Sequence, residues 1–129
     1  MGYESRLYVV DKHSSNTALV TVDGKEWKWT SFLARFDLSC VGNECSELWS
    51  GGKETDCIFS GIKPNGEYGD VFEDCYGMPL KEHTVKDTIR ILMKGEAKGH
   101  YRRYSAPIAY LMAIDESEWD DIVVLHYGY

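Results

Sequence analysis

Long apolar runs are absent from this sequence, and their absence excludes a class of protein. No stretch approaches the roughly 20 apolar residues that a helix needs to span a bilayer. The N-terminal residues lack the basic segment and the apolar block of a signal peptide. A myristoylation signal needs Ser or Thr at the position where this chain has Arg6. We therefore expect a cytoplasmic protein that contacts no membrane.

Catalytic motifs are missing as well. The HExxH, GxSxG and Walker patterns do not occur, and no two histidines have the i, i+4 spacing of metal ligands on one helix face. The segment Gly51-Gly52-Lys53 resembles the end of a phosphate-binding loop but lacks its other conserved positions. His126 could serve as a catalytic base, although a hydrogen-bonded core histidine is the commoner arrangement. We therefore expect that the protein is not an enzyme. A small enzyme with His126 at its active site is kept as a third hypothesis, after the two binding functions given below.

Closely spaced cysteine pairs are scarce. The chain has four cysteines, and only Cys40 and Cys45 lie near each other in the sequence. A structural zinc site usually needs a second close pair, which Cys57 and Cys75 do not provide. Cytosolic thiols stay reduced, so free and partly buried cysteines are expected. We predict no metal and no cofactor.

Aromatic residues, by contrast, are abundant. The 129 residues are 43% apolar and 13% aromatic, which is typical of a folded chain and suits a single domain over residues 1–129. Four Trp, nine Tyr and four Phe are more aromatic mass than a small core needs. Some of these rings are therefore expected on a surface patch or in a groove.

Strand patterns dominate the first half of the chain. Residues 5–11 predict a strand, and residues 17–29 predict a hairpin around Asp23-Gly24, a type I′ turn signal. A two-residue loop pairs Val20 with Trp27 and Ala18 with Trp29 on one face. Residues 32–40 alternate as a third strand, with a bend near Thr30-Ser31 where the parity changes. Short strands are predicted at residues 56–60 and 69–73, on either side of a Pro64-Asn65-Gly66 turn.

Two helices and a final strand are predicted in the second half. Thr84 begins the first helix, which buries Val85, Ile89 and Leu92, and Gly95 is expected to end it. Ser105 is expected to cap the second helix. The inner stripe of this helix is predicted to contain Tyr104, Ile108, Leu111 and Met112. Residues 121–127 are apolar on both parities, which places that strand in the middle of a sheet. The pattern predicts an α+β fold: an antiparallel or mixed sheet of about five strands with two helices packed on one face.

Acidic residues outnumber basic ones, and the net charge of −7 is unevenly distributed. Residues 43–75 contain eight acidic and two basic residues, and residues 115–121 contain five acidic residues and no basic one. Between them, residues 81–104 contain seven basic and three acidic residues. An acidic surface attracts basic protein surfaces and repels nucleic acid. The alternative interpretation is that the acids only keep the protein soluble.

Two acidic clusters are the candidate partner-binding sites. Four carboxylates after a turn could bind Ca²⁺ or Mg²⁺, but the EF-hand pattern is absent and a solvated acidic loop is favoured. Such a cluster could also mimic the phosphates of nucleic acid and occupy a Lys/Arg site. The first cluster comprises Glu67, Asp70, Glu73 and Asp74, and the second Asp115, Glu116, Glu118, Asp120 and Asp121.

A basic and aromatic segment offers an alternative site. Residues 94–104 interleave bases with aromatics, a composition that suits phosphate contacts and base stacking. The candidate nucleic-acid or nucleotide-binding residues are Tyr101, Arg102, Arg103 and Tyr104. The favoured interpretation is a helix–helix connection in which Arg102 and Arg103 pair with the acids near Asp115.

Three segments carry a resemblance to known proteins. Residues 1–8 (MGYESRLY), 74–80 (DCYGMPL) and above all 119–129 (WDDIVVLHYGY) resemble small, mostly uncharacterised proteins of phages and prophages of Gram-positive bacteria. The resemblance implies an accessory phage product. Small acidic phage proteins are often inhibitors of host machinery, including anti-CRISPR proteins that block the nucleic-acid groove of a Cas nuclease. The first hypothesis is therefore a non-catalytic inhibitor of a host protein with a basic surface, such as a CRISPR effector.

Overall fold

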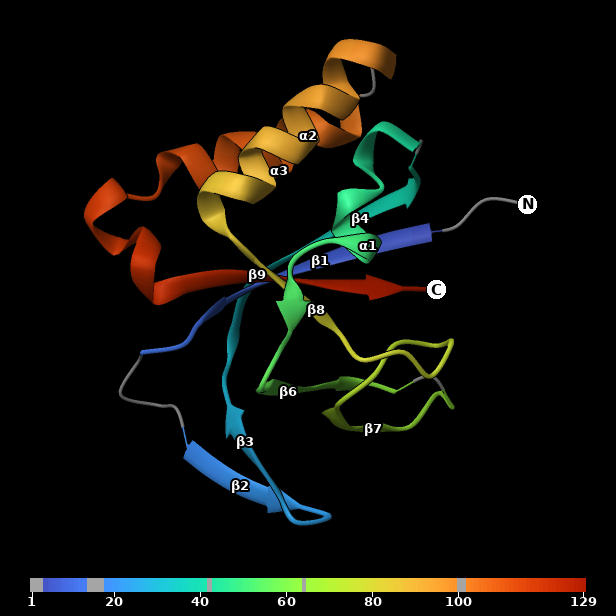
Figure 1. The fold of residues 1–129 in the computed structure, drawn as a ribbon, viewed down its shortest axis with the longest axis vertical. Helices are drawn as coiled ribbons and strands as arrows, with labels where there is room; N and C mark the ends of the chain where they lie inside the picture. Colours follow the sequence, from blue (N-terminus) through green and yellow to red (C-terminus); the bar gives the residue numbers. More distant parts are fainter. Residues whose placement is uncertain (1–3, 14–17, 42, 64, 100–101) are drawn as a thin grey trace.

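The chain folds into two sheets and a helical layer (Figure 1). The computed structural model describes residues 4–13, 18–41, 43–63, 65–99 and 102–129. The predicted α+β class is confirmed. The larger sheet is antiparallel, in the order β4 (Phe32–Cys40), β1 (Glu4–Asp11), β9 (Ile122–Gly128), β8 (Lys81–Thr84), β5 (Lys53–Glu54).

A smaller sheet, which the sequence did not predict as a separate sheet, has four strands. Its order is β2 (Ala18–Val22), β3 (Lys25–Trp29), β6 (Cys57–Ile62), β7 (Tyr68–Val71). The β3–β6 pair is parallel and joins two residue positions on each strand, whereas the other pairs are antiparallel. The helical elements are η1 (Asn43–Cys45), α1 (Glu47–Ser50), α2 (Val85–Gly99), α3 (Arg102–Ala113) and η2 (Glu116–Asp121).

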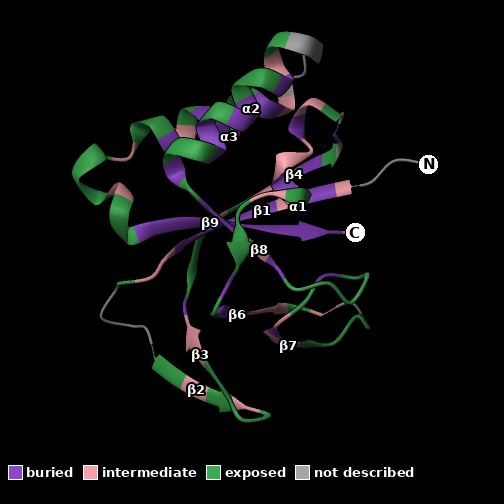
Figure 2. Cartoon of the chain, viewed as in Figure 1, coloured by how far each residue is buried: buried purple, intermediate pink, exposed green. Residues whose placement is uncertain are grey.

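Strand β9 lies in the middle of the larger sheet, as predicted, and all of its residues are buried (Figure 2). On one side, Ile122 and Val124 join a core with residues of α2 and α3. On the other side, Val123 and Leu125 pack in a second core that includes Phe59 of β6. The smaller sheet therefore supplies part of the cover for the face that the helices leave open.

The predicted hairpin is confirmed in its register. Val20 pairs with Trp27 and Ala18 with Trp29. Asp23 and Gly24 both have positive φ, 52° and 80°, as a type I′ turn requires. The bend predicted near Thr30 is the point at which the chain leaves the smaller sheet and enters the larger one. There the Thr30 N–H donates to the Ile58 carbonyl at 2.8 Å.

Helix α2 begins as predicted, because the Thr84 Oγ1 accepts the Asp87 N–H at 3.1 Å. Val85, Ile89 and Leu92 are buried. The predicted end at Gly95 is wrong, since α2 continues to Gly99. None of the described helices combines the length and the apolar character needed to cross a membrane.

Helix α3 begins at Arg102, so the predicted cap at Ser105 is wrong. The Ser105 hydroxyl instead donates to Glu96 of α2 at 2.9 Å. Tyr104, Ile108 and Leu111 form the buried stripe. Met112 is 56% exposed, which corrects its predicted inward position, because the buried stripe of this helix is narrow.

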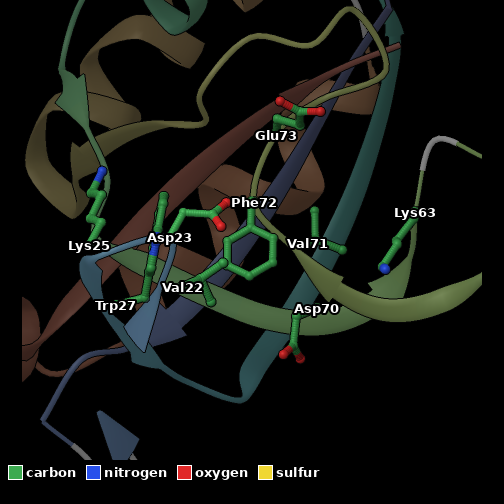
Figure 3. Close-up of a pocket in the computed structure, with 9 residues that line it drawn as sticks. All are labelled: Val22, Asp23, Lys25, Trp27, Lys63, Asp70, Val71, Phe72 and Glu73. Carbon is green, nitrogen blue, oxygen red and sulfur yellow. The ribbon is translucent and has the colours of Figure 1, made fainter. Parts of the chain in front are cut away.

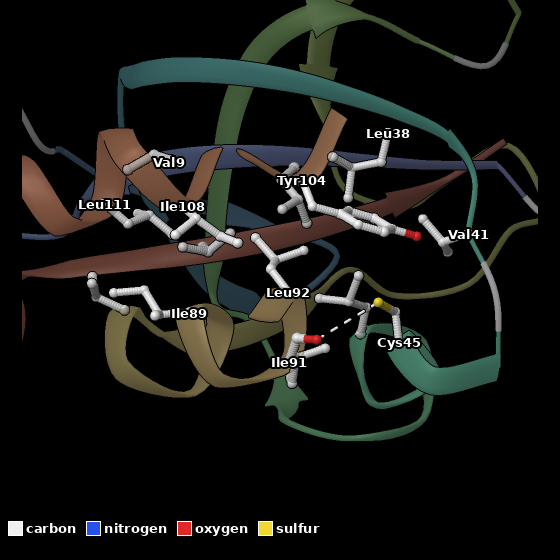
Figure 4. Packing of buried hydrophobic residues seen from close by; sticks show 14 of the residues in the cluster. Val9, Leu38, Val41, Cys45, Ile89, Ile91, Leu92, Tyr104, Ile108 and Leu111 are labelled. Atoms are coloured by element: carbon white, nitrogen blue, oxygen red, sulfur yellow. Dashed lines mark hydrogen bonds between the residues drawn. The ribbon is translucent and has the colours of Figure 1, made fainter. Parts of the chain in front are cut away.

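Gly95 allows a close contact and does not serve as a helix stop. A Cβ at this position would overlap the Cys45 Sγ and lie 3.0 Å from Cε2 of Tyr104. The Cys45 thiol donates to the Ile91 carbonyl at 3.7 Å, and Figure 4 shows it facing α2 and the Tyr104 ring. A glycine in α2 therefore lets the helices and the 43–45 turn approach each other.

We predict that Gly95→Ala destabilises the protein. Alanine gains about 1 kcal/mol in helix propensity over glycine. The overpacking against Cys45 and Tyr104 should cost about 1–3 kcal/mol, so the packing cost should prevail. Urea unfolding followed by circular dichroism measures the difference. The Cys45→Ala exchange removes the overlapping sulfur and should restore most of the loss in the double variant; a Gly95→Ala protein more stable than the parent would contradict this explanation.

Candidate functional site

A pocket lined by aromatic and charged side chains lies between the β2–β3 hairpin and strand β7 (Figure 3). Its volume is about 460 Å³, within the range of ligand and side-chain pockets. One wall comes from the β2–β3 hairpin and the other from β7 and the residues after it. The position of the pocket therefore depends on the hairpin turn and on the parallel pairing of β3 with β6, which joins the two halves of the smaller sheet. The lining residues are Val22, Asp23, Lys25, Trp27, Lys63, Asp70, Val71, Phe72 and Glu73.

Two aromatic rings form the apolar part of this pocket. The Trp27 and Phe72 ring centres lie 5.2 Å apart, with an angle of 73° between the planes. This edge-to-face arrangement is favourable for aromatic pairs. The Lys25 Nζ lies 4.0 Å from the centre of the Trp27 ring, which is a cation–π contact. The expected aromatic groove therefore exists, and a cation of the chain itself occupies its indole face.

Three acidic residues line the same pocket as the aromatic pair. Asp70 is oriented by a short relay: the Trp29 Nε1–H donates to the Ser60 Oγ at 3.3 Å, and the Ser60 hydroxyl donates to Asp70 Oδ1 at 3.4 Å. Asp23 and Glu73 are exposed at the pocket rim. With Lys25 and Lys63, the lining contains three acidic and two basic side chains. The pocket thus retains acidic character even with its own lysines present.

The structure divides the first predicted acidic cluster. Asp70 and Glu73 line the pocket, and Glu67 is exposed in the β6–β7 turn. Asp74 is 4% exposed, and its Oδ1 accepts the N–H groups of Tyr76 and Met78 at 2.9 and 3.0 Å. Asp74 therefore holds its own loop, and its carboxylate has little surface to offer a partner. Part of the turn lies outside the described residues, at Pro64.

The second predicted cluster occupies η2 and the residue before it. Asp115 accepts the Ser117 N–H at 3.0 Å and the Ser117 hydroxyl at 2.8 Å, and these hydrogen bonds hold its pKa below the usual range. Figure 1 places η2 and β7 on opposite sides of the molecule. The two clusters therefore do not form one surface. All five members, Asp115, Glu116, Glu118, Asp120 and Asp121, are exposed.

The basic and aromatic segment does not form the predicted site as a unit. Tyr104 is 0% exposed and lies in the core, so its ring offers no face to a base (Figure 4). Arg103 is half-buried, and Tyr101 lies outside the described residues. Of the predicted pairing with the acids near Asp115, Arg103 does not reach Asp115 itself, because the two residues lie at opposite ends of α3, about 18 Å apart at 1.5 Å per residue. The side chain of Arg102 lies outside the described part of the chain.

His126 is buried in β9 and does not line the pocket. Its Nε2 lies 2.8 Å from the Ser5 hydroxyl. Burial, together with the charge of nearby His83, lowers the pKa of His126 to about 3. Burial also lowers the pKa of His83, whose Nε2 lies 2.9 Å from the Leu48 carbonyl oxygen. Both imidazoles are therefore neutral at pH 7, and the geometry fits the core histidine that was the favoured interpretation.

An ionic cluster around the buried Glu82 escaped the sequence analysis. The Lys12 ammonium lies 3.0 Å from Asp56 Oδ1 and 3.1 Å from Glu82 Oε1. The Thr55 hydroxyl donates to Glu82 at 2.8 Å, and Lys53 lies 3.4 Å from its other oxygen. Glu82 is 6% exposed, so these partners compensate a carboxylate that is otherwise costly to bury. No local pattern could indicate this cluster, because Lys12 and Glu82 are 70 positions apart.

Asp56, Cys57 and Glu82 have ligand atoms within 4.8 Å of one another, close enough for a shared metal ion. The Lys12 ammonium already supplies a cation to both carboxylates. Burial raises the pKa of the Cys57 thiol to about 11, so it is protonated and a poor ligand at pH 7. Burial would raise the pKa of Asp56, but the hydrogen bond and charge of Lys12 lower it overall. The cluster is better explained as a structural ion pair network than as a metal site.

No known protein family, no curated protein and no solved structure matches this chain.

We predict that Lys12→Met lowers the free energy of unfolding by about 3 kcal/mol, because it leaves the buried Glu82 without its nearest cation. Urea titration gives the value. Glu82→Gln in the same chain removes the uncompensated charge while keeping an acceptor for Thr55, and should recover at least half of the loss. Lys86→Met on the exposed face of α2 is the control. If Lys86→Met lowers the free energy of unfolding as much as Lys12→Met does, the ionic cluster makes no specific contribution to stability.

We predict that acid weakens the fold in the range of the histidines. Because the folded-state pKa of His126 lies below the ordinary value of 6.5, protonation favours the unfolded chain. The stability is present above pH 6.5 and is lost as the pH falls towards 3. The slope that His126 contributes should approach about 1.4 kcal/mol per pH unit below pH 6.

Urea midpoints measured between pH 7 and 5 check this dependence, since ordinary carboxylates contribute little in that range. His126→Gln should flatten the profile, whereas His13→Gln, at an exposed position, should not. A His126 ring proton that titrates near pH 6.5 in NMR spectra would contradict the explanation.

Proposed function

We propose that this protein is a non-catalytic inhibitor that binds a basic surface of a partner protein through the rim of the pocket between β3 and β7. The observation that carries the proposal is the composition of this pocket. Asp70 and Glu73 line the pocket together with an aromatic pair, and Glu67 is exposed nearby in the β6–β7 turn. Protein interfaces typically have aromatic residues at the centre and polar or charged residues at the rim.

The charge of the whole chain supports the same partner class. At a net charge of −7, the protein repels nucleic acid and accelerates encounter with basic proteins. The exposed carboxylates of η2 add to this long-range field without reaching the pocket. Their role in the proposal is to speed encounter, and that of the pocket rim is to make the contacts.

The resemblance of the chain ends to phage proteins supports a host target whose natural ligand is a nucleic acid. A CRISPR nuclease holds its nucleic acids in a positively charged channel, which an acidic protein can occupy. We therefore include anti-CRISPR activity in the proposal. The alternative of a nucleic-acid module over residues 94–104 receives less support, because Tyr104 is buried and the chain is acidic.

Expression of this protein should relieve CRISPR interference. Bacterial strains, each carrying one active CRISPR nuclease, are challenged with a targeted plasmid in the presence and absence of the protein. We expect plasmid uptake to rise in at least one strain, and the nuclease to co-purify with the protein at low salt but less at high salt. Unchanged interference in every strain, with no co-purifying nuclease, would contradict the proposal.

Charge reversal identifies the surface. Glu67→Lys with Glu73→Lys should weaken nuclease binding about 10- to 100-fold, because each reversal converts an attraction into a repulsion. Glu116→Lys with Glu118→Lys changes the net charge by the same amount on η2 and is the matched control. Equal losses for the two pairs would show that net charge, and not the pocket rim, determines binding.

A further inference from the structure

The contact between Lys25 and Trp27 indicates what the pocket recognises. We infer that the pocket is a binding site for an arginine side chain of a protein partner, and that Lys25 occupies it as an internal substitute when no partner is bound. The inference rests on the proposed function, since it names the chemical group that the pocket rim would take from a basic surface.

The first argument is that the pocket already holds a cation. The Lys25 Nζ lies 4.0 Å from the Trp27 ring centre, and Phe72 meets Trp27 edge to face at 5.2 Å. Indole is the aromatic ring that binds cations best. Figure 3 shows Lys25 and Trp27 side by side on one wall of the pocket, with Phe72 next to them. The aromatic pair is therefore arranged as a cation-binding surface.

The second argument is the position of the carboxylates. The Ser60 hydroxyl, which accepts the Trp29 Nε1–H, donates a long hydrogen bond of 3.4 Å to Asp70 Oδ1 and so favours one orientation of this carboxylate. Asp23 and Glu73 stand at the rim. Three carboxylates against two lysines leave the lining acidic, and the acidity increases when Lys25 moves out. A cation that enters the pocket thus meets both an aromatic face and negative charge.

A guanidinium fits these surroundings better than an ammonium. Its planar group stacks on an aromatic face and forms paired hydrogen bonds with a carboxylate, whereas an ammonium acts as a point charge. The cation–π contact of Lys25 is made with the Trp27 ring, and Lys25 is exposed at the start of β3. Because an exposed cation–π contact is weak, the lysine can move into solvent at a small cost in affinity.

Titration with short peptides tests the inference on the full chain. The probe is the blocked tripeptide Gly-Arg-Gly, compared with Gly-Lys-Gly and Gly-Gln-Gly. The readout is the indole N–H signal of Trp27 in ¹H–¹⁵N spectra, assigned with Trp27→Phe. We expect a saturable shift with the arginine peptide, a weaker one with the lysine peptide and none with the glutamine peptide. If the assignment variant does not fold, amide signals of residues 23–29 and 70–73 replace the indole signal.

Lys25→Met is the decisive variant, because it removes the internal ammonium and keeps an unbranched side chain that is only one atom shorter. It should tighten binding of the arginine peptide about two- to fivefold, the size of an exposed cation–π contact. Lys28→Met makes the same charge change on β3, outside the pocket lining, and should leave the affinity unchanged. Asp70→Asn with Glu73→Gln should weaken binding about tenfold, since both carboxylates lose their charge.

Three results would overturn the inference. The first is that the arginine peptide causes no saturable shift of the Trp27 signal in either the parent or Lys25→Met. The second is that the glutamine peptide causes a shift of equal size. The third is that Lys25→Met changes the affinity for the arginine peptide no more than Lys28→Met does. Equal affinity for the lysine peptide would remove the preference for guanidinium. If the protein binds the arginine peptide but does not relieve CRISPR interference, the arginine site stands and the proposed partner class is wrong. If it relieves interference but does not bind the arginine peptide, the proposed function stands and the arginine site is wrong.

Discussion

The burial of β9 on both faces is the constraint on which the rest of the structure depends. A strand whose residues are all buried needs a cover on each side. The helical layer provides one cover, and β6 with its neighbours provides part of the other. The same burial leaves His126 with an interior hydrogen bond to Ser5 and a depressed pKa. The exposed carboxylates described above lie elsewhere, around the smaller sheet and on η2.

Local features of the fold could be predicted from the sequence because short-range rules determine them. The Asp23-Gly24 turn fixed the hairpin register, Thr84 began α2, and the two-sided apolar pattern placed β9 centrally. The second sheet could not be predicted, since its parallel β3–β6 pairing joins segments about 29 residues apart, such as Trp29 and Ile58. The prediction that Gly95 ends α2 was wrong for a similar reason. The role of this glycine depends on its contacts with Cys45 and Tyr104, which belong to other elements.

The candidate site shows the same division. The excess of aromatic residues correctly indicated a groove, and acidic residues near Asp70 line it. The sequence could not separate Asp70 from Asp74, because both follow the same turn and only the hydrogen bonds of the folded loop turn Asp74 inward. The contribution of Lys25 and Trp27 was also out of reach, since it depends on Phe72 from a different part of the chain.

The uneven attachment of the two sheets has a consequence for motion. Strand β1 pairs along most of its length with both β4 and β9, whereas the hairpin joins the rest of its sheet through two residue positions of β3 and β6. Segments with few cooperative hydrogen bonds open at a lower free energy than the global unfolding. We therefore expect amide protons of β2 and β3 to exchange with solvent before those of β9. The pocket lies on this less firmly paired sheet, so its walls are expected to rearrange at a lower free energy than the interior of the larger sheet.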